Sequence, residues 1–180
     1  MSQAAATATF HHYGISPWEM EVIYDTLRRS FEVEEKQLQP DDPQYASMIE
    51  IGFPLHYGEL FFQEFTMESW LKIKGVIKDA KSRRGRKGLK AVVRFAGFGN
   101  EVDADVVFPL LSKRDRSFEM GIEKIEYMVD IVPIQLMAIP PGIEEIWYSY
   151  DEDAYRWTPA VAKSDVISYA FRDGEWKKTK

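Results

Sequence analysis

The residue types that most often catalyse reactions or bind metals are scarce in this chain. It has no cysteine and three histidines, His11, His12 and His56. Without cysteine it forms no disulfide, no thiolate nucleophile and no cysteine-ligated zinc site. His11 and His12 fall in an expected mobile start, and His56 would need carboxylate co-ligands. We therefore expect no metal and no cofactor.

Acidic and glycine motifs are the next candidates for chemistry. Glu101, Asp103 and Asp105 alternate along the chain, which places them on one side of a strand or in a turn. Their spacing is not that of a calcium loop, so a solvated acidic edge is the simpler interpretation. Gly97 and Gly99 precede an expected strand rather than a helix, so they do not predict a phosphate-binding loop. We expect a protein that is not an enzyme.

Positive charge is concentrated in residues 81–90. This basic run contains six of the 23 Lys and Arg residues, Lys81, Arg83, Arg84, Arg86, Lys87 and Lys90. The other 17 face 29 Asp and Glu, so the body of the protein should repel phosphate backbones and attract basic peptides. The run has three interpretations: a solvated hairpin tip, a nuclear-import patch, or a salt-sensitive nucleic-acid contact.

Aromatic side chains are more informative, and they make up 14% of the chain. Phe95 and Phe98 are three residues apart across a glycine turn at the end of an expected strand, so both can point toward one spot. Two or three aromatic faces around a dry hollow attract a methylated ammonium group. The alternative is that both side chains fill the core.

The elements that would position these residues begin with a helix. Ser16 and Glu19 form a capping box around a proline, which predicts a helix over about 16–34. Apolar residues spaced by three and four make this helix amphipathic. Residues 35–58 are rich in proline and glycine and predict a linker, so residues 1–58 are expected to form an N-terminal arm.

The middle of the chain favours strands. Residues 71–77 alternate before a β-branched pair and are assigned to a strand, although a helix through Trp70 and Ala80 fits the same periodicity. We choose the strand because the basic run, with its two glycines, is typical of a hairpin loop and is followed at once by a strand over 89–95.

The C-terminal third is rich in β patterns. Residues 118–132 fit either an amphipathic helix or a strand. Two hairpins are clearer, over 146–157 and 166–177, each with a polar turn. The expected fold class is α+β and mainly β, a small barrel or open sheet with an N-terminal amphipathic helix.

Length and composition suit a folded domain. The 180 residues are 45% hydrophobic, which suffices for the core of one domain or of two small β modules. No apolar stretch approaches the roughly 20 residues of a bilayer span. The first fifteen residues lack the basic start and apolar run of a secretory signal, so we expect an intracellular protein with no membrane partner.

Residues 93–101, VRFAGFGNE, followed by Asp103, closely resemble the central motif of the SAWADEE domain. This domain is a plant chromatin-reader module built of tandem Tudor-like barrels. The resemblance extends to Trp70 upstream and to the basic segment 114–117 downstream, and it covers about residues 60–117.

The resemblance implies a Tudor-like barrel over residues 59–120. Residues 121–180 would then be a second β-rich module, conceivable as a zinc-free Tudor-like barrel because the family's cysteine ligands are absent. Two further positions differ from the family, since Leu71 stands at its cage tyrosine and Lys72 at its following aspartate.

The family binds histone H3 tails methylated on lysine. The resemblance therefore implies an aromatic cage of Phe95 and Phe98, with Trp70 as a replacement for the missing tyrosine. It also implies acidic contacts to the tail from Glu101 and Asp103.

From these features we expect a non-catalytic chromatin or protein-interaction module in the nucleus, with a methylated-lysine histone H3 tail as its partner. Two alternatives stay open. The first is a scaffold subunit with a degenerate Tudor-like barrel whose N-terminal helix docks a partner protein. The second is a nucleic-acid-binding β protein that uses the basic run, and the cytoplasm is the alternative location.

Overall fold

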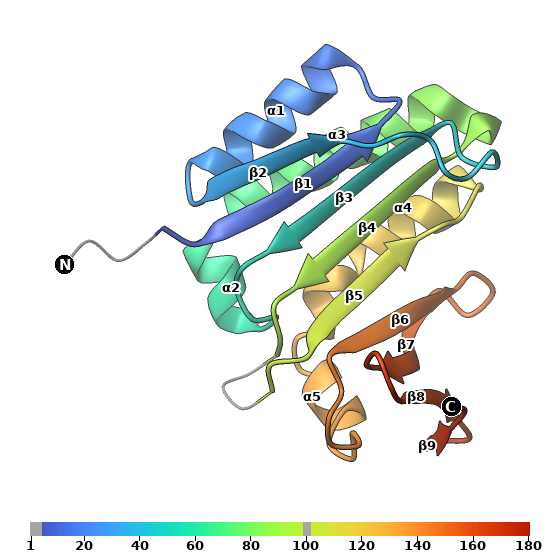
Figure 1. Ribbon diagram of the computed structural model, residues 1–180. Coiled ribbons are helices and arrows are strands. Elements are labelled where there is room, and N and C mark those ends of the chain that lie inside the picture. The colour runs from blue at the N-terminus through green and yellow to red at the C-terminus, as the bar shows by residue number, and fades with distance from the viewer. Residues whose placement is uncertain (1–4, 99–101) are drawn as a thin grey trace.

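The computed structural model describes residues 5–98 and 102–180, and one nine-stranded sheet forms its centre (Figure 1). The described strands are β1 (Thr7–Tyr13), β2 (Glu32–Gln37), β3 (Ser47–Phe53), β4 (Leu89–Phe95), β5 (Asp105–Leu110), β6 (Glu145–Asp151), β7 (Arg156–Lys163), β8 (Ser168–Arg172) and β9 (Glu175–Lys178). The described α-helices are α1 (Pro17–Arg28), α2 (Glu59–Glu64), α3 (Met67–Arg84), α4 (Asp115–Glu123) and α5 (Val132–Gln135). Short 3-10 helices η1 (Gly85–Lys87) and η2 (Ile125–Met128) follow α3 and α4.

Most of the sheet consists of three similar strand–helix–strand units. In each unit, a strand leads through helical segments to a parallel strand that lies next to it: β1 to β2, β3 to β4, and β5 to β6. The units join in antiparallel fashion, β1 against β3 and β4 against β5. Parallel neighbours require such crossovers, and the helices α1, α3 and α4 cover one face of the sheet (Figure 1). The protein is therefore a mixed α+β protein with a mostly antiparallel sheet.

The sheet is open rather than closed. Its strand order is β2-β1-β3-β4-β5-β6-β7-β8-β9, so β2 and β9 form its two edges. The expected Tudor-like barrel, single or tandem, is not confirmed. The expected arm, residues 1–58, contributes β1, β2 and β3, and β3 pairs directly with β4 of the segment 59–120. The expected mobile start was wrong from Thr7 onward, because β1 lies inside the sheet.

Helix α1 confirms the predicted capping box. The Ser16 hydroxyl accepts a hydrogen bond from the backbone N–H of Glu19 at 3.1 Å, and the Glu19 carboxylate accepts one from the backbone N–H of Ser16 at 2.9 Å. The helix ends at Arg28, earlier than the predicted limit of 34, because residues 32–37 pair with β1 instead.

The strand predicted over 71–77 was wrong, because these residues belong to α3. Its buried side chains recur at helical spacing and include Trp70, Ile73, Ile77 and Ala80. Ile73 and the β-branched pair Val76 and Ile77 therefore belong to the buried side of a long helix, whereas Leu71 of the alternating pattern is exposed. The basic run is consequently no hairpin loop, since it forms the last turn of α3, then η1 and the start of β4.

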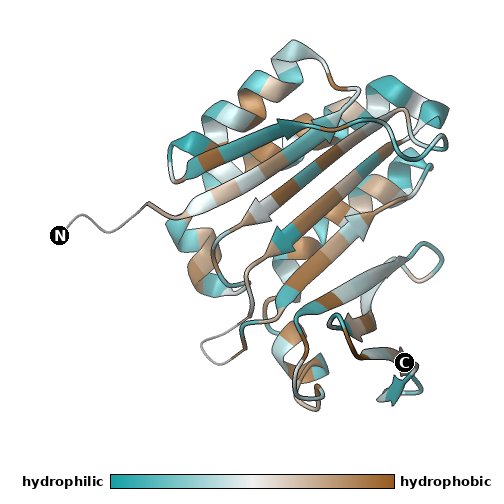
Figure 2. Ribbon diagram, in the orientation of Figure 1, coloured by the Kyte–Doolittle hydropathy of each residue, from teal (hydrophilic) through white to brown (hydrophobic). Residues whose placement is uncertain are grey.

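The register divides the sheet into a helix-covered face and an uncovered face. Paired residues share a face, and successive residues of a strand alternate between faces. Phe10, Ile51, Val93 and Phe108 lie in register on the covered face and are fully buried. In Figure 2 the hydrophobic residues concentrate in the central strands, whereas the edge strand β2 is largely hydrophilic. The core therefore lies between the sheet and its helices.

The C-terminal third forms the predicted hairpins. β6 pairs with β7, and β8 pairs with β9, which confirms hairpins over 146–157 and 166–177. The ambiguous segment 118–132 is helical, with α4 followed by η2 and the start of α5. Within the described parts of the chain, no helix is both long and apolar enough to cross a bilayer.

Candidate protein-interaction surface

The three side chains of the predicted aromatic cage lie in the core. Phe95 and Trp70 are fully buried, and Phe98 is 7% exposed. The Phe95 ring contacts those of Phe53 and Tyr57, with centroids 5.5 and 5.0 Å apart. The cage prediction was therefore wrong in its geometry, because the covered face of β4 directs Phe95 toward the helices rather than to a rim.

The predicted acidic contacts and the histidines come from different parts of the chain. Asp103 is exposed, and Glu101 lies outside the described residues. His12 is buried in β1 and its Nε2 contacts the Glu35 carboxylate of β2, whereas His11 points to the uncovered face. Among residues 5–98 and 102–180, no group of three His, Cys, Asp or Glu side chains is arranged to hold a metal ion.

Four of the six charges of the basic run are engaged within the fold. Lys81 is buried and donates to Asp115 at 2.6 Å, and Arg84 donates to Glu19 at 2.7 Å. Arg83 lies over the Trp18 ring, and Lys90 lies 3.7 Å from Asp41. The exposed Arg86 and Lys87 complete the run in η1. Half of the predicted basic patch, Lys81, Arg83 and Arg84, thus ties α3 to its neighbours.

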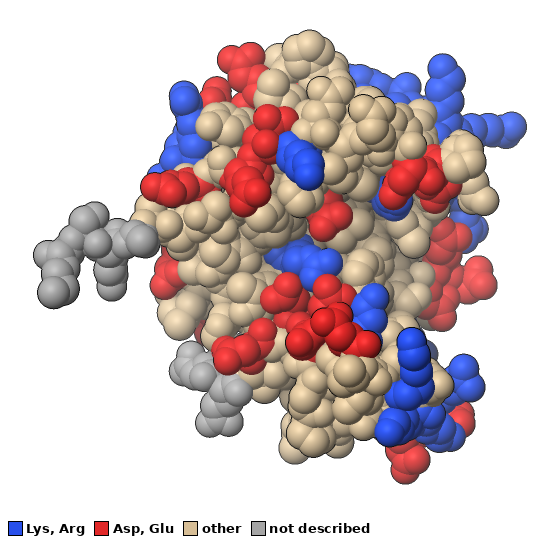
Figure 3. Space-filling model, in the orientation of Figure 1, with Lys and Arg blue, Asp and Glu red and all other residues tan. Residues whose placement is uncertain are grey.

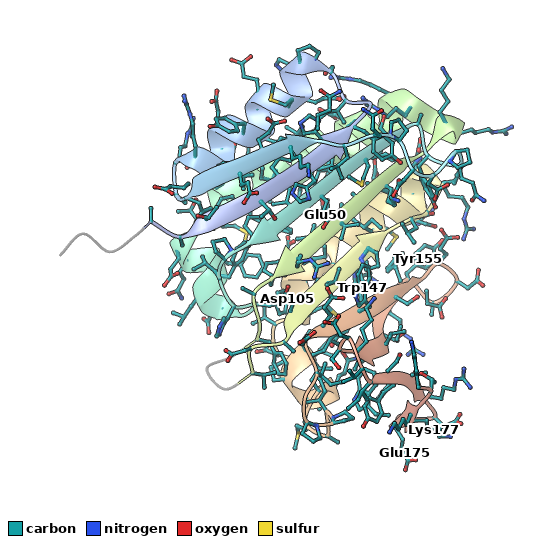
Figure 4. All side chains as sticks on the ribbon, viewed as in Figure 1. Glu50, Asp105, Trp147, Tyr155, Glu175 and Lys177 are labelled. Atoms are coloured by element: carbon teal, nitrogen blue, oxygen red, sulfur yellow. The ribbon has the colours of Figure 1, made fainter. Side chains whose placement is uncertain are left out.

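A charged cluster lies on the uncovered face where β4, β5 and β6 meet (Figures 3 and 4). Asp105 and Glu145 oppose each other in register, and the Arg94 Nη1 donates to both, at 3.2 and 2.9 Å. The Trp147 Nε1 donates to Glu145 at 2.8 Å, and its ring centroid lies 5.7 Å from the Arg94 guanidinium and 5.1 Å from the Lys163 amine.

The charged groups of this cluster are paired with one another. Burial raises the pKa of Glu145, but hydrogen bonds from Trp147 and Arg94 outweigh burial and hold that pKa below its ordinary value. Two carboxylates in direct opposition repel each other; Arg94 donates to both, and Lys163, 3.7 Å from Glu145, supplies the second positive charge. The cluster therefore stabilises the short pairing of β5 with β6, and we assign it no ligand.

A different surface, on residues 125–137, has apolar side chains on both of its sides. The inward side chains of this segment are buried in the core: Ile125, Met128, Val132 and Leu136. The outward side chains, which we name the outer apolar surface, are Tyr127, Ile131, Ile134 and Met137, with exposed fractions of 73%, 44%, 69% and 82%. Asp130 is also exposed, so the outer side is mainly but not wholly apolar. A helical segment with apolar side chains on two sides is normally covered on both. Here only one side is covered.

Buried polar contacts hold this segment from the inside. Trp70 Nε1 donates to the Glu126 carboxylate at 2.8 Å, and Lys74 donates to the same carboxylate at 2.6 Å. The Tyr57 hydroxyl donates to the Ile125 carbonyl oxygen, and burial raises the pKa of Tyr57. These contacts anchor η2, so the outer apolar surface is carried by a fixed part of the fold.

A groove adjoins the outer apolar surface and separates it from the β8–β9 hairpin. Its cavity volume is about 380 Å³. Phe171 and Trp176 of the hairpin line it, with ring centroids 5.0 Å apart, beside Ile134 and Met137. In Figure 4, Glu175 and Lys177 mark β9 at this groove. The Trp176 Nε1 is buried without a hydrogen-bond partner, which is unusual in a folded protein.

Sequence reasoning missed this surface. The signal was present in residues 125–139, where apolar residues occur on every side of a helical projection. That pattern predicts burial, but it does not distinguish burial within the fold from burial against a partner.

Comparison of the chain with protein-family models, with curated proteins and with solved structures found no match, and nothing in them identifies a SAWADEE domain.

Proposed function

We propose that the chain is a non-catalytic protein-interaction module whose partner covers the outer apolar surface. The single observation that carries this proposal is the two-sided apolar character of residues 125–137, with one side packed in the core and the other uncovered. Contiguous exposed apolar surface is typical of protein–protein contacts.

The energetics favour a partner at this place. Full burial of one large apolar side chain is worth about 1.5–3 kcal/mol, and residues 125–137 carry four exposed ones, of which Ile134 and Met137 line the same groove. Association costs at least about 4 kcal/mol in lost freedom, so burial of several of these side chains is needed for binding.

The other functions expected from the sequence have less support. A methylated-lysine cage needs accessible aromatic faces, and Phe95 and Trp70 have none. A nucleic-acid contact needs unpaired cations, and Lys81 and Arg84 of the basic run are paired with carboxylates. A partner-binding subunit is the part of those hypotheses that we retain.

A dye and a peptide selection test the proposal. Anilinonaphthalene sulfonate should fluoresce with the wild type and at least threefold less with the double variant Ile134→Glu/Met137→Glu. Peptides selected from a random displayed library should bind the wild type and lose at least tenfold in affinity for that variant. Val166→Glu, which removes an apolar side chain exposed to 75% elsewhere, is the matched control and should change neither result. Selected peptides that bind all three proteins equally would contradict the proposal.

A further inference from the structure

The strand β2 is an edge of the sheet with an unpaired outer side. It pairs only with β1, and five of its six residues are exposed. An unpaired strand edge presents a row of backbone N–H and C=O groups that another extended chain can pair with. At six residues, β2 is long enough to template a short strand.

A groove follows this edge, between β2 and α1. Its cavity volume is about 580 Å³. Met20 and Tyr24 of α1 and Val33 of β2 form its apolar lining, and Glu21 and Glu35 are its charged residues. A segment added to β2 would therefore place alternate side chains over an apolar floor with acidic neighbours.

The other side of β2 is also acidic. Val33 and Glu35 pair with Ala8 and Phe10, which fixes them on the helix-covered face. Glu32, Glu34 and Lys36 consequently lie on the uncovered face, because residues alternate along a strand, and this face of β2 keeps a net negative charge. Both sides of an added strand would meet carboxylates.

We propose that an extended segment of a partner protein, with alternating apolar and Lys or Arg side chains, adds to β2 as a tenth strand. Its main chain would pair with the edge, its apolar side chains would enter the α1–β2 groove, and its basic side chains would face Glu32 and Glu34. Strand addition of this kind draws affinity from main-chain hydrogen bonds and specificity from alternate side chains. This surface is separate from the outer apolar surface, so the inference does not depend on the proposed function.

Charge argues against a second copy of this chain as the occupant. Each β2 strand carries three glutamates, Glu32, Glu34 and Glu35, against one lysine, Lys36, so two such edges have the same net negative charge and repel each other. A strand rich in Lys or Arg meets the opposite condition.

Three synthetic peptides test the proposal on the full chain. The first is a fluorescein-labelled Lys-Leu-Lys-Val-Lys-Leu-Lys peptide, the second replaces every Lys with Glu, and the third is the first with N-methyl groups on every backbone nitrogen. We expect measurable binding of the first peptide by fluorescence anisotropy and at least tenfold weaker binding of the other two. Equal binding of the first and third peptides would overturn strand addition, because N-methylation of every residue removes the main-chain donors from both edges of the peptide.

Protein variants and hydrogen exchange locate the site. Glu32→Gln/Glu34→Gln should weaken the first peptide at least fivefold, while Glu64→Gln/Glu68→Gln, two exposed glutamates outside β2, should not. Amide exchange should slow in residues 32–37 when the peptide is bound. Protection elsewhere with none in β2, or self-association of the free chain that the first peptide does not reverse in light scattering, would overturn the proposal.

Discussion

The region around α1 and α3 differs from the C-terminal third in two respects. These are whether buried polar atoms have hydrogen-bond partners and whether large apolar side chains are covered. The Glu19 carboxylate is almost fully buried, yet it accepts hydrogen bonds from Arg84 at 2.7 and 2.8 Å and from the backbone of Ser16 at 2.9 Å. In the C-terminal third, the Trp176 Nε1 is buried without a partner and Met137 is 82% exposed. Buried polar groups are costly unless paired, so the buried Glu19 of the first region needs no partner from outside the chain. The contrast is the reason our proposed partner covers the C-terminal third.

The largest expected effect on stability is in the packed core between the sheet and its helices. Phe95→Ala should lower the free energy of unfolding by about 3–5 kcal/mol, because it empties a fully buried position between Phe53 and Tyr57. Phe171→Ala, at a partly buried position in β8, should cost less than about 2 kcal/mol. Urea denaturation measures both. Equal losses would erase the contrast between the two regions.

The next effect concerns the ion pairs beneath η2. Lys74→Met should lower the free energy of unfolding by about 3 kcal/mol, since it leaves the largely buried Glu126 carboxylate without a cation. The double variant Lys74→Met/Glu126→Gln should recover part of this loss. Thermal denaturation of both variants, compared with the wild type, tests the expectation, and a single variant as stable as the wild type would contradict it.

The same paired carboxylates predict acid sensitivity. Burial raises the pKa of Glu19, but hydrogen bonds from Arg84 and from the backbone of Ser16 outweigh it, so the folded pKa lies below the ordinary 4.5. A depressed folded pKa adds stability above the unfolded pKa and loses it as pH falls through the folded value. We expect the free energy of unfolding to decline below about pH 4.5. The Glu19→Gln variant should show a shallower decline in denaturation series from pH 6 to 3.

The smallest expected effect on stability is on the outer apolar surface. Ile134→Glu should change the free energy of unfolding by no more than about 0.5 kcal/mol, because its side chain is 69% exposed in the free chain. Calorimetry measures this change. A loss comparable to that of Phe95→Ala would mean that the outer apolar surface is already covered in the isolated protein.

Local features were predictable from the sequence. The capping box of Ser16 and Glu19 sets the start of α1, and the polar turns at 151–153 and 172–174 set the two C-terminal hairpins. Each of these depends on residues a few positions apart, so their chemistry is visible in the sequence.

Non-local features were not predictable in the same way. Residues 71–77 fit a strand or a helix, and the choice depended on α3 packing its Trp70 and Ile73 side against the sheet. The cage prediction for Phe95 and Phe98 failed for a related reason. Nothing in a local pattern tells whether an aromatic residue lies at a rim or in register with Phe53 inside the core.

The sequence alone determined which segments are apolar, where helix α1 begins and that the chain is acidic outside the basic run. Only the tertiary structure decided that β1 and β3 belong to one open sheet and that Lys81 and Arg84 form ion pairs within the chain. It also decided that one side of residues 125–137 stays uncovered. The physical reason is that burial and charge pairing depend on contacts between residues far apart in the chain, whereas capping and turn formation depend on neighbours.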